Sequence, residues 1–156
     1  MAALGTAAFF AVAPGVMAGV IPWALTGWEA RADWPVARVV GVALTLAGAA
    51  FLVHAFARFV WEGRGTPAPV APTERLVIGG LYRYVRNPMY VALLAAIVGQ
   101  ALLLGRWVLL GYAAGVFVVV YVFVRLYEEP KLAGTYGEQY AQYRRAVPGW
   151  LPFVRR

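Results

Sequence analysis

Four long apolar segments limit what this 156-residue chain can fold into. They cover residues 3–26, 36–60, 88–104 and 107–127, and most charged residues lie between them. A helix needs roughly 20 apolar residues to cross a bilayer. Hydrophobic residues make up 62% of the chain, more than in an ordinary soluble domain. The sequence therefore predicts an all-α integral membrane protein, a single domain (1–156) with about four transmembrane helices.

The basic residues are distributed unevenly between the connecting segments. Eleven of the 14 fall within positions 58–87 or 125–156, and only Arg31, Arg38 and Arg106 fall elsewhere. Because cytoplasmic segments are enriched in Lys and Arg, we expect a multi-pass protein with both termini and the polar segment 61–87 in the cytoplasm. The net charge of +7 then favours contact with anionic lipids over nucleic acid.

The composition argues against two kinds of site. The chain contains no cysteine, which excludes disulfides and thiolate chemistry. Its single histidine, His54, cannot form a cluster of histidine ligands. We therefore predict no metal site, and the role of His54 stays open.

Two features bear on how the apolar segments pack. Pro14 and Pro22 are expected to kink or break segment 3–26, which leaves open whether it forms one helix or two. Segment 36–60 contains small residues that either allow another helix to approach closely or reflect ordinary membrane composition: Gly41, Ala43, Ala47, Gly48 and Ala50.

A polar stretch over residues 80–90 leads into the third apolar segment. Pro88 suits the first turn of a helix, where its missing N–H costs nothing, and Asn87 is a candidate N-cap. We therefore expect a helix to begin at Pro88 with Tyr82, Arg86 and Tyr90 near its start. The positive end of this helix favours an anionic group.

Glu128 and Glu129 follow the last apolar segment. Segments 88–104 and 107–127 are joined only by Gly105 and Arg106, so they should form a hairpin that brings these acids close to the start of the third segment. A solvated helix end would explain them equally well. Acids at a helix C-terminus oppose the helix dipole, however, which favours a function: binding ribose hydroxyls or an ammonium group, or balancing a bound cation.

The C-terminal part predicts an amphipathic helix. Thr135-x-x-Glu138 has the form of a capping box, and Pro148-Gly149 should end the helix. The helix is expected to lie on the membrane or to fold back on the helical bundle, and residues 150–153 are expected to enter the membrane interface. One face carries Tyr136, Tyr140, Tyr143 and Val147.

These motifs occur in a recognisable order. Gly80-Leu81-Tyr82, Arg86-Asn87-Pro88-x-Tyr90 and Glu128-Glu129-x-x-Leu132 are followed by Tyr136-Gly137-Glu138-x-Tyr140-x-x-Tyr143 and the ending Val147-Pro148, Leu151-Pro152-Phe153. Residues 79–153 thereby resemble the isoprenylcysteine carboxyl methyltransferase family and the wider group that includes phospholipid N-methyltransferases. Residues 1–78, apolar segments and a polar loop, do not share the resemblance.

The resemblance implies an S-adenosylmethionine-dependent membrane enzyme, in which Arg86 and Glu129 are the expected catalytic residues. Position 87 is often His in the family, so Asn87 implies hydrogen bonding in place of proton transfer. The chain has fewer N-terminal helices than the eukaryotic members, so prenylcysteine specificity is not implied. The implied cofactor-binding residues are Tyr82, Arg86, Asn87, Pro88, Tyr90, Glu128, Glu129, Leu132, Tyr136 and Tyr140.

The predicted function is methylation of a lipophilic or lipid-like acceptor through a carboxyl, amine or thiol group, at a site facing the cytoplasm. Its expected partners are that acceptor and membrane lipids. Two alternatives stay open. One is an NADPH-dependent membrane reductase with a sterol-reductase-like layout. The other is a non-enzymatic protein that binds lipid.

Overall fold

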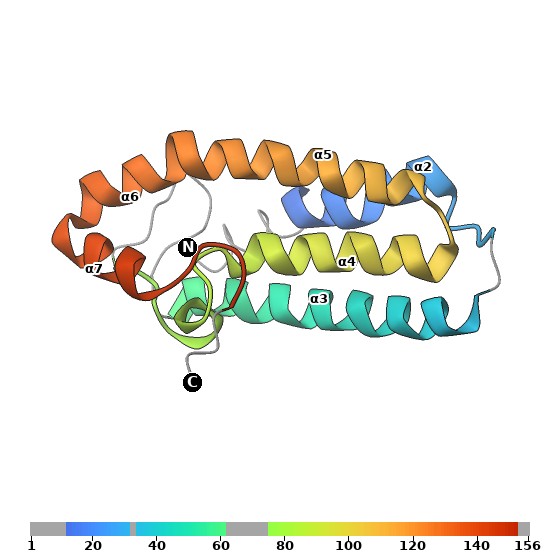
Figure 1. The fold of residues 1–156 in the computed structure, drawn as a ribbon, viewed down its shortest axis with the longest axis horizontal. Coiled ribbons are helices and arrows are strands. Elements are labelled where there is room, and N and C mark those ends of the chain that lie inside the picture. Colours follow the sequence, from blue (N-terminus) through green and yellow to red (C-terminus); the bar gives the residue numbers. More distant parts are fainter. Residues whose placement is uncertain (1–11, 32–33, 62–74, 153–156) are drawn as a thin grey trace.

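The computed structural model describes residues 12–31, 34–61 and 75–152, and these residues form helices and loops without a strand (Figure 1). The predicted all-α fold is confirmed for this part of the chain. In chain order the elements are the π-helix η1 (Val16–Val20), α2 (Ile21–Thr26), α3 (Pro35–Trp61), the 3₁₀-helix η2 (Gly80–Arg83), α4 (Pro88–Leu104), α5 (Val108–Phe123), the π-helix η3 (Val124–Glu128), α6 (Glu129–Tyr136) and α7 (Glu138–Ala146).

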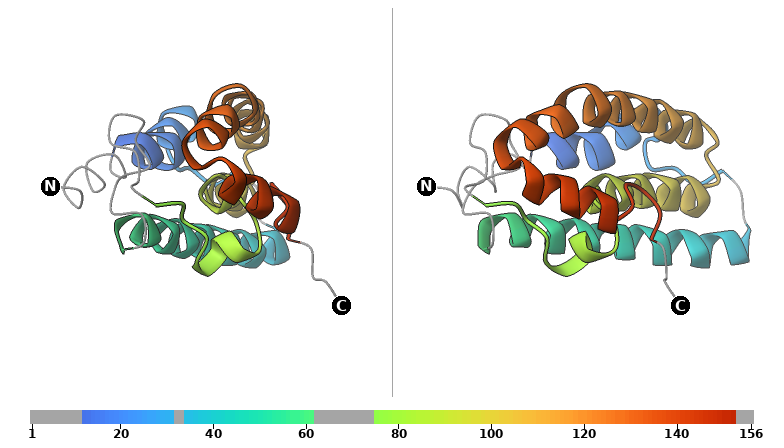
Figure 2. Two further views of the ribbon diagram at one scale, coloured as in Figure 1. Left: turned by 90° about the vertical axis from the view of Figure 1, so that its left-hand side faces the viewer. Right: turned by 60° about the vertical axis from the view of Figure 1, so that its left-hand side comes forward.

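Helices α3, α4 and α5 run side by side, with η1 and α2 packed near α4 and α5 (Figures 1 and 2). The contact between α3 and α4 is tight because glycines line it. A Cβ added at Gly48 would lie 2.7 Å from the carbonyl oxygen of Ala92 and 2.7 Å from the amide nitrogen of Ala96. The prediction that small residues of α3 allow another helix to approach closely is thus confirmed, and the approaching helix is α4.

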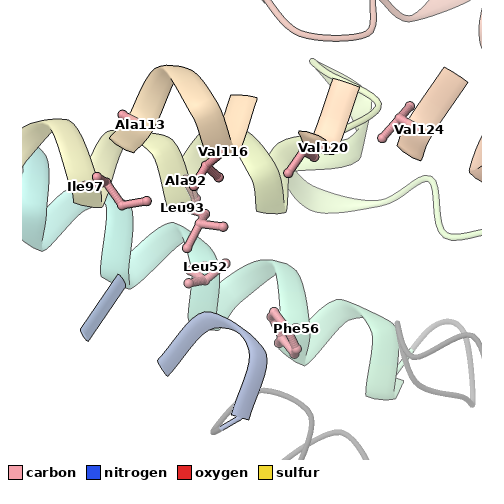
Figure 3. Close-up of a cluster of buried hydrophobic side chains, with 9 residues drawn as sticks. All are labelled: Leu52, Phe56, Ala92, Leu93, Ile97, Ala113, Val116, Val120 and Val124. Atoms are coloured by element: carbon pink, nitrogen blue, oxygen red, sulfur yellow. The ribbon is translucent and has the colours of Figure 1, made fainter. Parts of the chain in front are cut away.

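Apolar side chains from three long helices form the main core cluster (Figure 3). Close packing of such side chains holds helices together in lipid, where the hydrophobic effect between helices is lost. The cluster consists of Leu52, Phe56, Ala92, Leu93, Ile97, Ala113, Val116, Val120 and Val124.

Within residues 12–31, 34–61 and 75–152, two helices are long and apolar enough to cross a membrane, Pro35–Arg58 and Val108–Tyr136. In the most apolar 18-residue stretch of each helix, only 17% and 28% of the stretch are buried within the chain. The core helix of a soluble protein would be mostly buried. Their outward faces carry apolar residues such as Val39, 70% exposed, and Val119, 66% exposed. These faces suit lipid, and the chain is a membrane protein. The two other apolar helices, Val12–Thr26 and Pro88–Leu104, are shorter.

The C-terminal region differs from the sequence prediction. The helix that begins at Val108 does not end near Tyr127 but continues through η3 and α6 to Tyr136. Glu128 and Glu129 therefore lie inside a long helix and do not stand at its C-terminus. The predicted capping box is also wrong, because Thr135 belongs to α6 and does not cap α7.

Gly137 separates α6 from α7 and reverses the chain. Its φ of 51° and ψ of −125° are accessible to glycine and strained for other residues. This turn, and not a side-chain cap, is the start of α7, and it directs α7 back towards η2 and the start of α4 (Figure 2).

Near the N-terminus, Pro22 follows the π-helix η1 by two residues. A proline has no N–H to donate to the carbonyl four residues earlier, here that of Ala18. Gln100 of α4 donates to this carbonyl instead, with 2.7 Å between Nε2 and the oxygen, and the Tyr112 hydroxyl donates to Met17 at 2.9 Å. The described helix Val12–Thr26 continues through Pro22, with a π-helical turn before the proline in place of the predicted break. Pro14 lies in the first described turn of this helix. Residues 3–11 of the predicted segment lie outside the described residues.

Candidate functional site

Helix α4 begins at Pro88, as predicted, and Asn87 occupies the N-cap position. The Asn87 side chain does not cap the helix, however. Its Nδ2 donates to the carbonyl of Gly149 at 3.1 Å, and its backbone N–H donates to the same oxygen at 3.1 Å. Asn87 therefore holds the segment that follows α7 against the start of α4.

Arg86 is the centre of the polar network. Its Nη1 donates to Glu129 at 2.8 Å and to the Tyr140 hydroxyl at 3.2 Å. Its Nε donates to the carbonyl of Val147 at 3.1 Å, and its backbone N–H donates to Pro148 at 2.8 Å. One side chain thus connects α6, α7 and the C-terminal segment to the loop before α4.

Glu129 is surrounded by three arginines. Its carboxylate lies 2.8 Å from Arg86, 3.1 Å from Arg125 and 3.5 Å from Arg144. The side chains of Arg86 and Glu129 are 14% and 9% exposed, whereas Arg125 and Arg144 are each 48% exposed. The inner pair is charge-assisted and shielded from water, so it is the strong contact, and the two outer guanidinium groups leave a surplus of positive charge.

Glu128 has a different environment from its neighbour. The Tyr90 hydroxyl donates to Glu128 Oε2 at 3.1 Å. Consecutive side chains on a helix point about 100° apart, so Glu128 reaches the first turn of α4 while Glu129 reaches the loop before it. The two acids therefore face two separate parts of one site.

The tyrosines of α7 face this site. Tyr140 is buried, and the Tyr143 hydroxyl donates to the carbonyl of Tyr82 at 2.7 Å. Burial raises the pKa of both phenols, so they remain neutral hydrogen-bonding groups at ordinary pH. Of the two arrangements expected for this helix, the structure has the one in which it folds back.

The structure brings most of the residues implied by the resemblance to one end of the bundle. Tyr82 is buried in η2, where its carbonyl is held by α7. Pro88 starts α4, next to the contacts of Asn87 and Tyr90. Leu132 and Tyr136 lie on α6 and are partly exposed, and the contacts described above do not include them.

Sequence reasoning missed an aromatic cluster beside Glu128. The Trp150 ring lies 5.3 Å from Phe117 in an edge-on arrangement, 6.0 Å from Tyr121 and 6.3 Å from Tyr90, measured between ring centroids. Phe117 and Tyr121 are one helical turn apart and share a face of α5, a spacing that signals a common contact. Nothing in the sequence pattern indicates that Trp150 completes the cluster.

Arg125 was also missed as a site residue. Arg125 is four residues before Glu129, a spacing that favours an ion pair on a helix. Arg144 reaches the same carboxylate from α7 only because the chain reverses at Gly137.

Comparison with known proteins matches residues 36–139 to the family described as phospholipid methyltransferase. The match covers most of the chain, and this protein belongs to that family. It includes Arg86, Tyr90, Glu128 and Glu129, whereas Tyr140 and Trp150 lie beyond it. The family resemblance stated from the motifs is thus confirmed, but the match also covers residues 36–78, which were predicted to lie outside it.

A curated relative is the protein-S-isoprenylcysteine O-methyltransferase of Schizosaccharomyces pombe (strain 972), which is 34% identical over 79 residues. The aligned part covers 51% of this chain and 34% of the relative, so the chain spans about a third of that protein. No solved structure matches the chain.

Proposed function

We propose that this chain is a multi-pass membrane enzyme that transfers a methyl group from S-adenosylmethionine to a lipophilic or lipid-like acceptor. The observation that carries the proposal is the buried Arg86–Glu129 pair. Its members are 43 residues apart in sequence and both fall within the part matched to the methyltransferase family. A pair that holds only two helices together would not need two further arginines around the same carboxylate.

We further propose four spans with the site facing the cytoplasm. Helix α4 has 17 residues, or about 26 Å at about 1.5 Å per residue, close to the roughly 30 Å of the hydrocarbon core. Val12–Thr26 is of similar length. The uneven distribution of basic residues supports the orientation, because Arg86, Arg125 and Arg144 all lie at the end of the bundle where the site is found.

The residues present suit the chemistry of the donor. The surplus of arginine around Glu129 suits the carboxylate of the methionine moiety. Glu128 and the ring of Tyr90 suit a cation or hydroxyl groups. Asn87, Leu132, Tyr136 and Tyr140 would complete the pocket, as the family resemblance implies. When bound, S-adenosylmethionine supplies an electrophilic methyl group carried by a sulfonium.

The role of the protein in such a transfer is to position the reactants. Displacement at a methyl group needs alignment of the two reacting atoms, and holding them together contributes several kcal/mol, up to about 7–11. The hydrogen bonds that tie Arg86 and Asn87 to residues 147–149 fix this end of the bundle. Asn87 has no proton to exchange at neutral pH, so its contribution is a hydrogen bond.

A lipophilic acceptor fits the location. The site lies at the end of helices whose outer faces are apolar, so an amphiphile can approach from the bilayer with its head group near the polar network. The names of the family and of the yeast relative, phospholipid methyltransferase and isoprenylcysteine methyltransferase, both point to lipophilic acceptors. Carboxyl, amine and thiol groups all remain candidates.

Binding of S-adenosylhomocysteine, the product of the donor, tests the site. We expect Glu129→Ala and Asn87→Ala to lose binding in isothermal titration of the purified protein. Glu138→Ala is the matched control, because Glu138 is 68% exposed and only loosely paired with Arg145 at 3.7 Å. Thermal unfolding of each variant shows whether it is folded. Wild-type affinity in both site variants would refute the site.

A second ligand separates the enzyme classes. A ligand that binds only the folded state raises apparent stability by about 2.7 kcal/mol at 100 times its dissociation constant. We expect stabilisation by S-adenosylhomocysteine and none by NADPH. Stabilisation by NADPH alone would replace the proposal with the reductase, and stabilisation by neither would favour a lipid-binding protein.

A further inference from the structure

The two adjacent carboxylates of the site differ in how their charge is compensated. Glu129 faces three guanidinium groups within 3.5 Å. Glu128 instead accepts a hydrogen bond from the uncharged hydroxyl of Tyr90. In the described part of the chain, Glu128 thus has no guanidinium partner like those of Glu129, although it is largely enclosed by the helices around it.

The aromatic cluster adjoins Glu128 through Tyr90. Tyr90 belongs to both, because its hydroxyl contacts Glu128 and its ring contacts Trp150. Trp150 is held in place from the other side, since the neighbouring Gly149 carbonyl accepts two hydrogen bonds from Asn87. A fixed indole ring beside a carboxylate is a combination that attracts organic cations, and tryptophan gives the strongest cation–π contact.

We propose that Glu128 and the rings of Tyr90 and Trp150 form a subsite for an organic cation, while Glu129 organises the arginines. The inference rests on the proposed function, and it divides the acidic pair into two roles. Two sources supply such a cation: the sulfonium of the methyl donor, or the ammonium head group of an amphiphilic acceptor. Phe117 and Tyr121 are 40% and 41% exposed, so the cluster is open to an amphiphile from the side.

The donor is tested by comparing two ligands that differ in one charge. S-adenosylmethionine carries the sulfonium and S-adenosylhomocysteine does not. We expect Trp150→Leu and Glu128→Gln to lower the ratio of their affinities about fivefold, within the range of a partly desolvated cation–π contact. Trp150→Phe should retain most of the ratio. Trp61→Leu is the control, because Trp61 is 75% exposed at the end of α3.

The acceptor is tested with decyltrimethylammonium. It is titrated into the full-length protein in nanodiscs with S-adenosylhomocysteine present, and into the same variants. Loss of this binding with an unchanged affinity ratio would assign the subsite to the acceptor. A lowered ratio would assign it to the donor. If neither quantity changes in Trp150→Leu and Glu128→Gln, the subsite is refuted.

The controls separate this proposal from the proposed function. If wild-type protein binds S-adenosylhomocysteine and both readouts stay unchanged in the variants, only the cation subsite fails. If wild-type protein does not bind S-adenosylhomocysteine, the proposed methyltransferase fails, and binding of decyltrimethylammonium that depends on Glu128 would still support a cation site.

Discussion

The two π-helical segments of this protein have the same local cause and different uses. Each ends two residues before a proline, η1 before Pro22 and η3 before Pro130. A proline inside a helix lacks the N–H and crowds the carbonyl four residues earlier, and a wider π turn relieves this crowding. In η1 the carbonyls of Met17 and Ala18 accept hydrogen bonds from side chains of other helices. In η3 residues 125–127 are exposed, and Glu128 at its end and Glu129 directly after it point into the site.

The difference follows from the surroundings. A freed carbonyl that is shielded from water needs a donor from another helix, and in η1 Gln100 and Tyr112 supply it, so η1 is a packing contact. In η3, by contrast, Arg125 and Leu126 are exposed, and Leu126 is 76% exposed, so this turn is not a packing contact between helices. The wider turn there is free to set the direction of Glu128 and Glu129.

The largest effect on stability is expected from removing Arg86, which contacts Glu129 directly after η3. Arg86→Ala should lower the free energy of unfolding by about 2–3 kcal/mol, because it leaves a buried carboxylate with only its outer partners. Arg145→Ala, at a residue 75% exposed, should change it by less than about 0.5 kcal/mol. Thermal unfolding followed by tryptophan fluorescence measures both. Equal changes in the free energy of unfolding of the two variants would show that the Arg86–Glu129 pair contributes no more to stability than the exposed Arg145–Glu138 pair.

Exchanging each proline tests the comparison itself. Pro130→Ala restores an N–H and removes the reason for the π turn, so Glu128 and Glu129 should rotate away from α4. We expect affinity for S-adenosylhomocysteine to fall about tenfold, equivalent to about 1.4 kcal/mol, with little change in stability. Pro22→Ala should leave the affinity unchanged. A larger loss of affinity in Pro22→Ala than in Pro130→Ala would reverse the assignment of the two segments.

A smaller effect is expected from Gln100→Leu, which removes the donor to the Ala18 carbonyl. In a membrane interior such hydrogen bonds contribute about 0.6–2 kcal/mol, and we expect a loss of about 1 kcal/mol in stability. The double variant with Pro22→Ala gives a mutant cycle. Because alanine at position 22 can supply the missing N–H, Gln100→Leu should then cost less. An unchanged cost in the Pro22→Ala background would mean that the proline does not create the need for Gln100.

The smallest expected effect is that of Tyr112→Phe, which keeps the ring and removes the hydroxyl that donates to Met17. The loss should be about 0.5 kcal/mol, at the low end for a neutral hydrogen bond. Tyr84→Phe is the matched control, because Tyr84 is 62% exposed. A loss above about 2 kcal/mol would indicate a role for the hydroxyl beyond this one bond.

The apolar segments and the start of α4 were predictable because their signals are local. A run of apolar residues specifies a helix in lipid wherever it occurs, and proline at position 88 suits a first turn in any context. The family motif was likewise readable, since its residues occur in a fixed order. The helix end near Tyr127 was predicted wrongly because acids and a proline suggest an end. In the structure a π turn precedes the proline and the helix continues, while Arg86 contacts Glu129 and the Tyr90 hydroxyl donates to Glu128.

By itself the sequence determined a helical membrane protein and the set of polar residues from which a site can be built. Only the tertiary structure decided which of them meet. Arg86 contacts Glu129 from 43 residues away and Tyr140 from 54 residues away, and Trp150 joins Tyr90 through a segment held by Asn87. These contacts depend on the hairpin at Gly105 and the reversal at Gly137. No local pattern reports where two such turns bring distant side chains together.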